Sequence, residues 1–78
     1  MASVFHAGAV VGGDPQFVVG NNRTLAAAMK KAERLAAKLG GVPMVERWDA
    51  RHGSHPGPNA VEAFMMRDGD EWGAWKRP

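Results

Sequence analysis

A row of basic residues at helical spacing is the strongest candidate for chemistry in this sequence. Lys30, Arg34 and Lys38 lie four residues apart, and Lys31 lies beside them. Residues four apart project from one side of a helix, so a helix here carries these cations as one solvent-facing row. Glu33 is the only acid among them. Such a row can hold phosphates or an acidic protein surface, or it can simply be a solvated helix face.

A second basic cluster lies near the C-terminus, where Lys76 and Arg77 follow Trp72 and Trp75. Cations beside indole rings can clamp a partner or support stacking on a nucleic-acid base. The alternative is a frayed terminal segment that is exposed to solvent. The sequence leaves both interpretations open.

Histidine and acid side chains gather between residues 49 and 55. Asp49, His52 and His55 are spaced three apart and are of types that can ligate a metal. Glycine and prolines in this segment argue against the helix that would place the three on one face, and no fourth ligand is apparent. His6 lies alone in an apolar run. We therefore predict no metal site, no cofactor and no catalytic residue.

Composition describes one small domain that spans residues 1–78. The 78 residues are 45% apolar and 23% charged, and they include no cysteine. Conformational entropy of about 1.5 kcal/mol per ordered residue offsets nearly all the burial free energy of so short a chain, which argues against a deep, dry active site. The absence of thiols excludes disulfides and cysteine-ligated zinc. We expect a cytoplasmic protein that is not an enzyme.

Net charge and the N-terminal residues limit the kinds of partner that the sequence predicts. The formal charge is +2, which is mild, so any binding of anions must come from clustered cations. The first residues lack the basic region of a signal peptide, and glycines interrupt their apolar stretch, so we predict neither a signal peptide nor a membrane contact.

The elements that must position these residues include two β-prone runs at the N-terminus. Residues 3–11 are rich in valine and alanine, and a Gly-Gly-Asp-Pro turn sequence separates them from a second run at 16–19. These runs predict an opening hairpin. A third strand is predicted at 42–49, where Pro43 is tolerated near the start of an edge strand.

Helical spacing is clearest from Leu25 to Leu39. Apolar residues recur there at intervals of three and four, which is the pattern of a helix with one buried face. Thr24 or Asn22 can accept a hydrogen bond from the first free amides, and a Gly-Gly pair directly after the helix provides a left-handed stop. The sequence therefore predicts a helix with both ends marked.

A loop and a second hairpin complete the chain. Residues 50–59 contain two prolines and two glycines, which predicts an exposed loop. Asp68 and Gly69 separate β-prone runs at 60–67 and 71–77. An Asp-Gly pair in this setting is a strong hairpin signal, because a type I′ turn requires positive φ angles.

The order ββαβββ predicts an α+β fold, an antiparallel sheet of four to five strands with one amphipathic helix packed on one face. With Asp68 and Gly69 as the two loop residues, Phe64, Met66 and Trp75 share the face that the helix leaves open. These side chains then need a protein partner or a second copy of the chain, as in a homodimer. The alternative is a sheet that curls over its own apolar residues.

One short motif resembles an enzyme family. Gly53-Ser54-His55 is similar to the Gly-Ser-His stretch of small toxin ribonucleases with a double-stranded-RNA-binding-like fold. The resemblance implies that His55 serves RNA cleavage, and imidazole suits general acid or base chemistry near neutral pH. The chain departs from that family in its long β-rich N-terminus and in having no evident C-terminal helix.

A broader pattern covers more of the chain. The helix LAAAMKKAERLAAK, the run VPMVERWD and the hairpin FMMRDGDEWGAWK together resemble small phage-encoded anti-CRISPR proteins with one helix on an antiparallel sheet. The resemblance implies a stoichiometric inhibitor that binds a type I CRISPR surveillance complex and occludes the surface for target DNA, often through basic side chains. If the protein is phage-encoded, the resemblance implies that it acts in the cytoplasm of the host cell.

Three hypotheses follow for function. The first is a non-catalytic inhibitor or adaptor that binds a protein or nucleoprotein complex. The second is direct DNA or RNA binding, with phosphate contacts from the helix and base stacking on Trp75. The third is a ribonuclease that uses His55. The candidate partner-binding residues are Lys30, Lys31, Arg34, Lys38, Phe64, Met66, Trp75 and Lys76.

Overall fold

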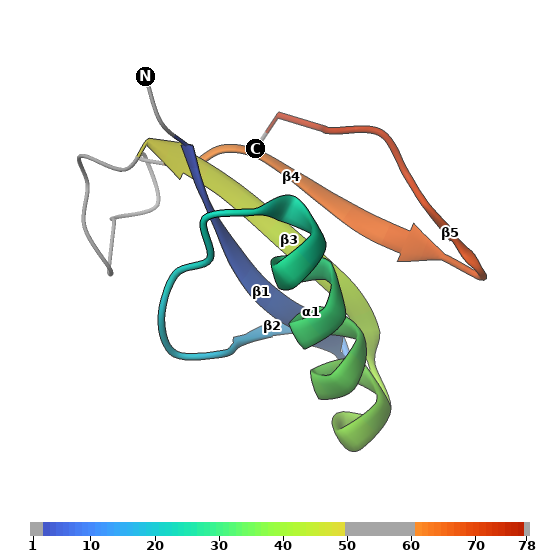
Figure 1. Ribbon diagram of the computed structural model, residues 1–78. Helices are drawn as coiled ribbons and strands as arrows, with labels where there is room; N and C mark the ends of the chain where they lie inside the picture. Colours follow the sequence, from blue (N-terminus) through green and yellow to red (C-terminus); the bar gives the residue numbers. More distant parts are fainter. Residues whose placement is uncertain (1–2, 50–60, 78) are drawn as a thin grey trace.

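The computed structural model describes residues 3–49 and 61–77. It contains one five-stranded antiparallel sheet with strand order β2-β1-β3-β4-β5 and one helix (Figure 1). The elements in chain order are β1 (Ser3–Val11), β2 (Asp14–Phe17), α1 (Leu25–Leu39), β3 (Val42–Asp49), β4 (Val61–Asp68) and β5 (Glu71–Trp72). The predicted α+β fold and the order ββαβββ are confirmed.

Helix α1 begins and ends where the sequence predicts. The Thr24 hydroxyl accepts a hydrogen bond of 3.3 Å from the Ala27 amide, so Thr24 is the N-cap. Gly40 ends the helix at φ +74°, and its amide donates to the Ala36 carbonyl at 2.8 Å. In the described part of the chain, no helix is long and apolar enough to cross a membrane.

The core lies between α1 and the two strands beneath it. Three alanines of the helix, Ala28, Ala32 and Ala36, are buried, and α1 lies over β1 and β3 (Figure 1). Because alanine is small, the helix can approach the sheet closely. Ala28 and Ala32 pack with Val45 of β3 and Met65 of β4 in the central cluster. The predicted helix-covered face is confirmed.

The second strand of the opening hairpin starts earlier than predicted. Val11 pairs with Asp14, so Gly12 and Gly13 alone form the turn, both at positive φ. The prediction of a strand at 16–19 is therefore wrong at both ends. Pro15 is accommodated because β2 is an edge strand of the sheet.

The turn of the C-terminal hairpin lies one residue later than predicted, which shifts the strand pairing by two residues. Asp68 pairs with Glu71, so Gly69 and Asp70 form the turn, with Gly69 at φ +64°. Regular pairing ends at Trp72. The predicted strand at 71–77 is thus largely wrong, because only its first two residues form a strand.

Residues after β5 return to β4 at a single point. The amides of Phe64 and Lys76 each donate to the other's carbonyl, at 2.9 and 2.8 Å. This bridge holds the C-terminal segment against β4 as far as Lys76. The alternative of a frayed segment is therefore wrong for this part of the chain.

Candidate functional site

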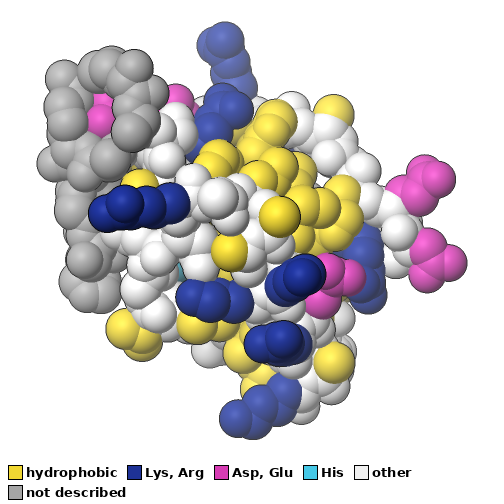
Figure 2. Space-filling model, in the orientation of Figure 1, with side chains coloured by type: hydrophobic (Ala, Val, Ile, Leu, Met, Phe, Trp, Pro, Cys, Tyr) yellow, Lys and Arg dark blue, Asp and Glu magenta, His cyan; other side chains and the backbone are white. Residues whose placement is uncertain are grey.

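Four basic side chains lie on the solvent side of α1. We call Lys30, Lys31, Arg34 and Lys38 the basic ridge; all four are exposed, as predicted. Figure 2 shows Lys and Arg side chains gathered over the helix. Within the described residues, no ion pair joins a ridge cation to a carboxylate. The ridge therefore presents uncompensated positive charge to solvent.

The acid within this stretch of helix is paired with a cation outside the ridge. The Glu33 carboxylate accepts a hydrogen bond of 3.0 Å from the Arg67 guanidinium of β4, which also makes the pair a salt bridge. Arg67 thus neutralises the charge that could otherwise compensate Lys30 or Arg34. As a half-exposed pair it adds little stability, but it leaves the ridge cations available to a partner.

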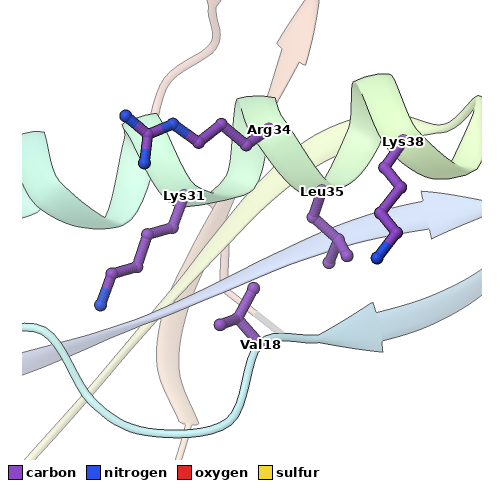
Figure 3. A pocket seen from close by; sticks show the side chains of 5 residues that line it. All are labelled: Val18, Lys31, Arg34, Leu35 and Lys38. Atoms are coloured by element: carbon purple, nitrogen blue, oxygen red, sulfur yellow. The ribbon is translucent and has the colours of Figure 1, made fainter.

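A groove of about 280 Å³ lies beside the ridge, between α1 and the segment that follows β2 (Figure 3). Its lining residues are Val18, Lys31, Arg34, Leu35 and Lys38. We call it the ridge groove. In Figure 3 the Leu35 side chain points toward Val18, with Lys31 and Lys38 on either side. A hydrogen bond of 2.9 Å from the Val18 amide to the Ala7 carbonyl fixes that segment against β1.

Sequence reasoning missed the ridge groove. It placed Leu35 on the apolar stripe and Val18 in a β-prone run, but no sequence pattern links the two. They meet because the chain turns back after β2 and its Val18 packs against the central cluster. A contact between two segments that are distant in sequence leaves no periodic pattern of residues in the sequence.

Trp75 lies on the helix side of the sheet, and its predicted place on the open face is wrong. The ring packs against the central cluster and stacks on Phe5 at a centroid distance of 6.2 Å. The Arg47 guanidinium lies over the same ring at 4.8 Å from its centroid. The irregular segment after β5 moves Trp75 to this side, because Lys76 pairs with Phe64 where the regular register would place Trp75.

Phe64 and Met66 do lie on the face opposite the helix. They pair with Glu46 and Met44, which alternate with the core residue Val45. Both are half-buried within the single chain, so the prediction that they lack any intramolecular cover is wrong. Their contact with a partner and self-association through this face stay predictions.

The second basic cluster gains a member from β3. Arg47 borders a surface hollow together with Trp75, Lys76 and Arg77, and Glu62 lines the same hollow. The Arg47 guanidinium lies 3.9 Å from the Glu62 carboxylate. This hollow is therefore partly charge-compensated, which makes it a weaker anion site than the basic ridge.

An aromatic stack crosses the helix-free face. The His6 ring lies between those of Phe17 and Trp48, at centroid distances of 4.6 and 4.9 Å. Phe17 lies over Gly8, where a Cβ would come within 2.7 Å of the ring. Only 3% of Trp48 is exposed. Sequence reasoning missed this stack, which needs the sheet register to assemble.

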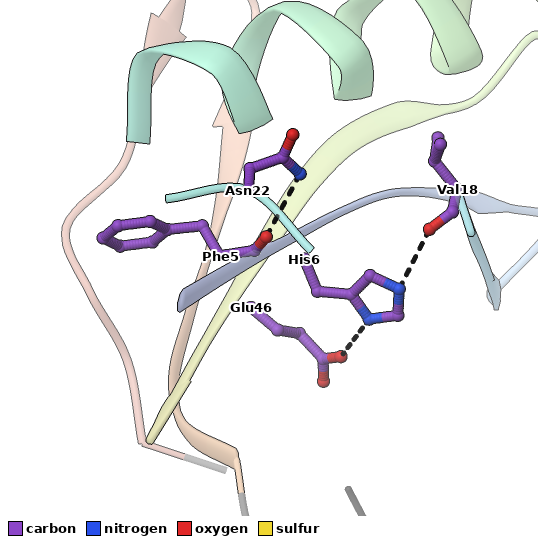
Figure 4. A network of polar contacts seen from close by, with 5 residues as sticks. All are labelled: Phe5, His6, Val18, Asn22 and Glu46. Carbon is purple, nitrogen blue, oxygen red and sulfur yellow. Dashed lines mark hydrogen bonds and ion pairs between the residues drawn. The ribbon is translucent and has the colours of Figure 1, made fainter. Parts of the chain in front are cut away.

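Polar contacts hold His6 in that stack (Figure 4). Its Nε2 atom lies 3.0 Å from the Val18 carbonyl, and its Nδ1 atom lies 4.0 Å from the Glu46 carboxylate. Burial raises the pKa of the Glu46 carboxyl above its ordinary value of 4.5. His6 is thus a structural residue that ties β1 to the segment before α1.

Glu46→Gln is expected to raise the free energy of unfolding at pH 7, because the amide has no charge to desolvate. A carboxyl with a raised folded-state pKa stabilises the fold below the unfolded value, and this stability is lost as pH rises through the folded value. The advantage of Glu46→Gln should therefore vanish below pH 4.5, the ordinary value. Urea unfolding from pH 3.5 to 7.5 measures the difference.

The exposed variant Glu71→Gln controls for the loss of one negative charge. A Glu46→Gln protein that is less stable than wild type at pH 7 would contradict the expected sign. It would mean that the contact with His6 outweighs desolvation of the carboxylate.

The described residues contain no group of three or more metal-ligating side chains. Asp49 ends β3, whereas His52 and His55 lie outside the described residues, as does the whole loop predicted at 50–59. The ribonuclease hypothesis on His55 falls there as well and stays a prediction.

The geometry therefore points to binding through the basic ridge and the ridge groove. No protein-family model, curated protein or solved structure matches the chain. The resemblance to anti-CRISPR proteins stays a hypothesis on the sequence pattern. The charges and contacts of the surface itself are what indicate a function.

Proposed function

We propose that this protein is a non-catalytic, stoichiometric binding protein that places its basic ridge on an acidic surface of a protein or nucleoprotein complex. The observation that carries the proposal is the exposed ridge whose neighbouring acid, Glu33, is already paired with Arg67 at 3.0 Å. Uncompensated cations on one helix face speed encounter with a negative surface and select against positive ones.

Two features favour a protein surface over a bare nucleic acid. The direct-binding alternative needs Trp75 to stack on bases, but its ring already contacts Phe5 and Arg47. The groove within the ridge is apolar and contains no aromatic ring on which a base could stack. An acidic protein surface matches both the charge and the apolar groove.

The anti-CRISPR resemblance supplies the first partner to test, a type I CRISPR surveillance complex. An inhibitor of this kind acts by occupying the surface where target DNA binds, so it needs tight and selective contact but no chemistry. A small domain with a charged helix face suits that role.

Lys30→Glu combined with Arg34→Glu is expected to weaken binding to the surveillance complex at least about tenfold. Each reversal replaces an attraction with a repulsion at a contact worth up to about 1 kcal/mol. Association rates and target-DNA binding by the complex are measured with wild type and variant at two salt concentrations. The loss should shrink at high salt, because exposed charges are screened.

Lys76→Glu combined with Arg77→Glu is the matched control, since it makes the same change in net charge at the second basic cluster. Equal losses in both variants would show that only net charge matters, which contradicts a specific role for the ridge. Failure of wild type to bind the complex would overturn the anti-CRISPR assignment. Tight binding to free DNA or RNA that falls linearly with log salt would favour the nucleic-acid alternative.

A further inference from the structure

We infer that the ridge groove receives an aliphatic side chain from an acidic peptide segment of the partner. The inference rests on the proposed function and gives the chemistry of what the ridge binds. It combines three observations: the apolar interior of the groove, the cations at its rim and the exposed apolar residues that adjoin its lining in the chain.

The size and lining of the groove suit a side chain better than a whole ligand. Its volume of about 280 Å³ lies just below the roughly 300–1,000 Å³ of small-molecule pockets. The exposed surface inside it is almost entirely apolar, with Val18 and Leu35 facing each other (Figure 3). A leucine-sized side chain can be buried there, out of contact with water, without leaving a polar group unpaired.

The cations at the rim of the groove favour a peptide in which acidic residues flank the aliphatic one. Lys31 and Lys38 flank Leu35, and their Cα atoms lie about 10 Å apart along the helix at 1.5 Å per residue. Together with Arg34 they can meet carboxylates on both sides of an aliphatic residue. A fatty acid carries one terminal carboxylate and engages one such cation, whereas an acidic peptide can engage all of them.

Exposed apolar residues adjoin the groove lining in the chain. Among the described residues the most exposed large apolar side chain is Val19, at 88%, and it directly follows Val18. Leu39, 41% exposed, directly follows Lys38. Val19 and Leu39 are thus exposed apolar side chains next in the chain to two lining residues, and a peptide that extends past the groove can cover them.

The test uses two fluorescein-labelled peptides, each with four glutamates on both sides of a central residue, which is leucine in one and serine in the other. Fluorescence anisotropy at low salt measures their Kd. We expect the leucine peptide to bind wild type at least about tenfold more tightly, because only leucine gains from burial. The NMR methyl signals of Val18 and Leu35 should shift with the leucine peptide.

Leu35→Gln should abolish the preference for leucine while leaving the affinity for the serine peptide within about twofold, since glutamine keeps helix propensity and the rim charges remain. The methyl shifts are measured on wild type, so they do not depend on the folding of this variant. Lys31→Glu combined with Lys38→Glu should weaken both peptides.

The outcomes separate the two proposals. Equal affinity of wild type for both peptides, or methyl shifts that spare Val18 and Leu35, would overturn the groove inference while leaving the ridge as an acidic-surface site. No binding of either peptide at low salt would overturn the ridge as well. A leucine preference that Leu35→Gln retains would place the aliphatic contact elsewhere and overturn the inference.

Discussion

Ala32→Leu is expected to lower the free energy of unfolding by about 3 kcal/mol, at the upper end of the usual cost of overpacking. Ala32 is 0% exposed and lies in the central cluster with Val45 and Met65. Its methyl group sets the distance between α1 and the sheet, so the added carbons must push the helix outward or distort its neighbours. A domain of this size has a total stability of roughly 4–12 kcal/mol, so the expected loss is a large part of it.

Ala37→Leu is the matched control, because it makes the same substitution on the exposed side of the same helix. Alanine and leucine have similar helix propensities, so the expected change is below about 0.5 kcal/mol. Urea unfolding followed by far-ultraviolet circular dichroism gives both values, and thermal scans should show Ala32→Leu melting more than about 10 °C lower. Equal effects of the two substitutions would show that α1 does not pack through Ala32.

Helix α1 could be predicted almost completely from the sequence, because every signal for it is local. The apolar spacing lies within one segment, and the residues that end it, Thr24 and Gly40, act through their own hydroxyl and backbone angle. The sequence alone does not decide whether Thr24 or Asn22 is the cap. Asn22 is buried instead, and its side-chain amide donates to the Phe5 carbonyl at 3.1 Å.

The register of the C-terminal hairpin could not be predicted, because two local solutions are nearly equivalent. Asp68-Gly69 and Gly69-Asp70 are both good two-residue turns, and each uses Gly69 at positive φ. Contacts distant in sequence distinguish them, since the observed register allows Trp72 and Trp75 to pack against the cluster beneath α1. The two turns differ in strand pairing by two residues, which leaves each side chain of β5 on its predicted face. The extra residue between Trp72 and Lys76, which pairs with Phe64 in place of Trp75, is what moves Trp75 across the sheet.

The candidate site likewise has one part that local sequence predicts and other parts that it does not. The basic ridge follows from the spacing within one helix, so the sequence was sufficient to predict its exposure. The ridge groove joins Leu35 to Val18 across the turn before the helix, and the hollow beside Trp75 gains Arg47 from another strand. Contacts between elements depend on sheet order and register, which local patterns do not encode.

Trp75→Ala is expected to lower the free energy of unfolding by about 2–3 kcal/mol. The main role of this side chain should therefore be in stability and not in partner binding. Large-to-alanine changes at buried tryptophan cost about 3–5 kcal/mol, and the half-buried position reduces that figure. The substitution also removes the stack on Phe5 and the cation–π contact with Arg47, the latter worth about 0.5–1 kcal/mol when exposed. Equilibrium unfolding in urea measures the loss.

Lys76→Ala separates the role of the indole from that of the segment that carries it. The bridge between Lys76 and Phe64 uses backbone atoms only, so it survives this change, and little stability should be lost. A double-mutant cycle of Arg47→Ala and Trp75→Ala then isolates their coupling, expected at about 0.5–1 kcal/mol. If Trp75→Ala instead leaves stability unchanged and abolishes partner binding, the indole is a partner anchor, as the sequence alone predicts, and its packing against the core contributes nothing measurable.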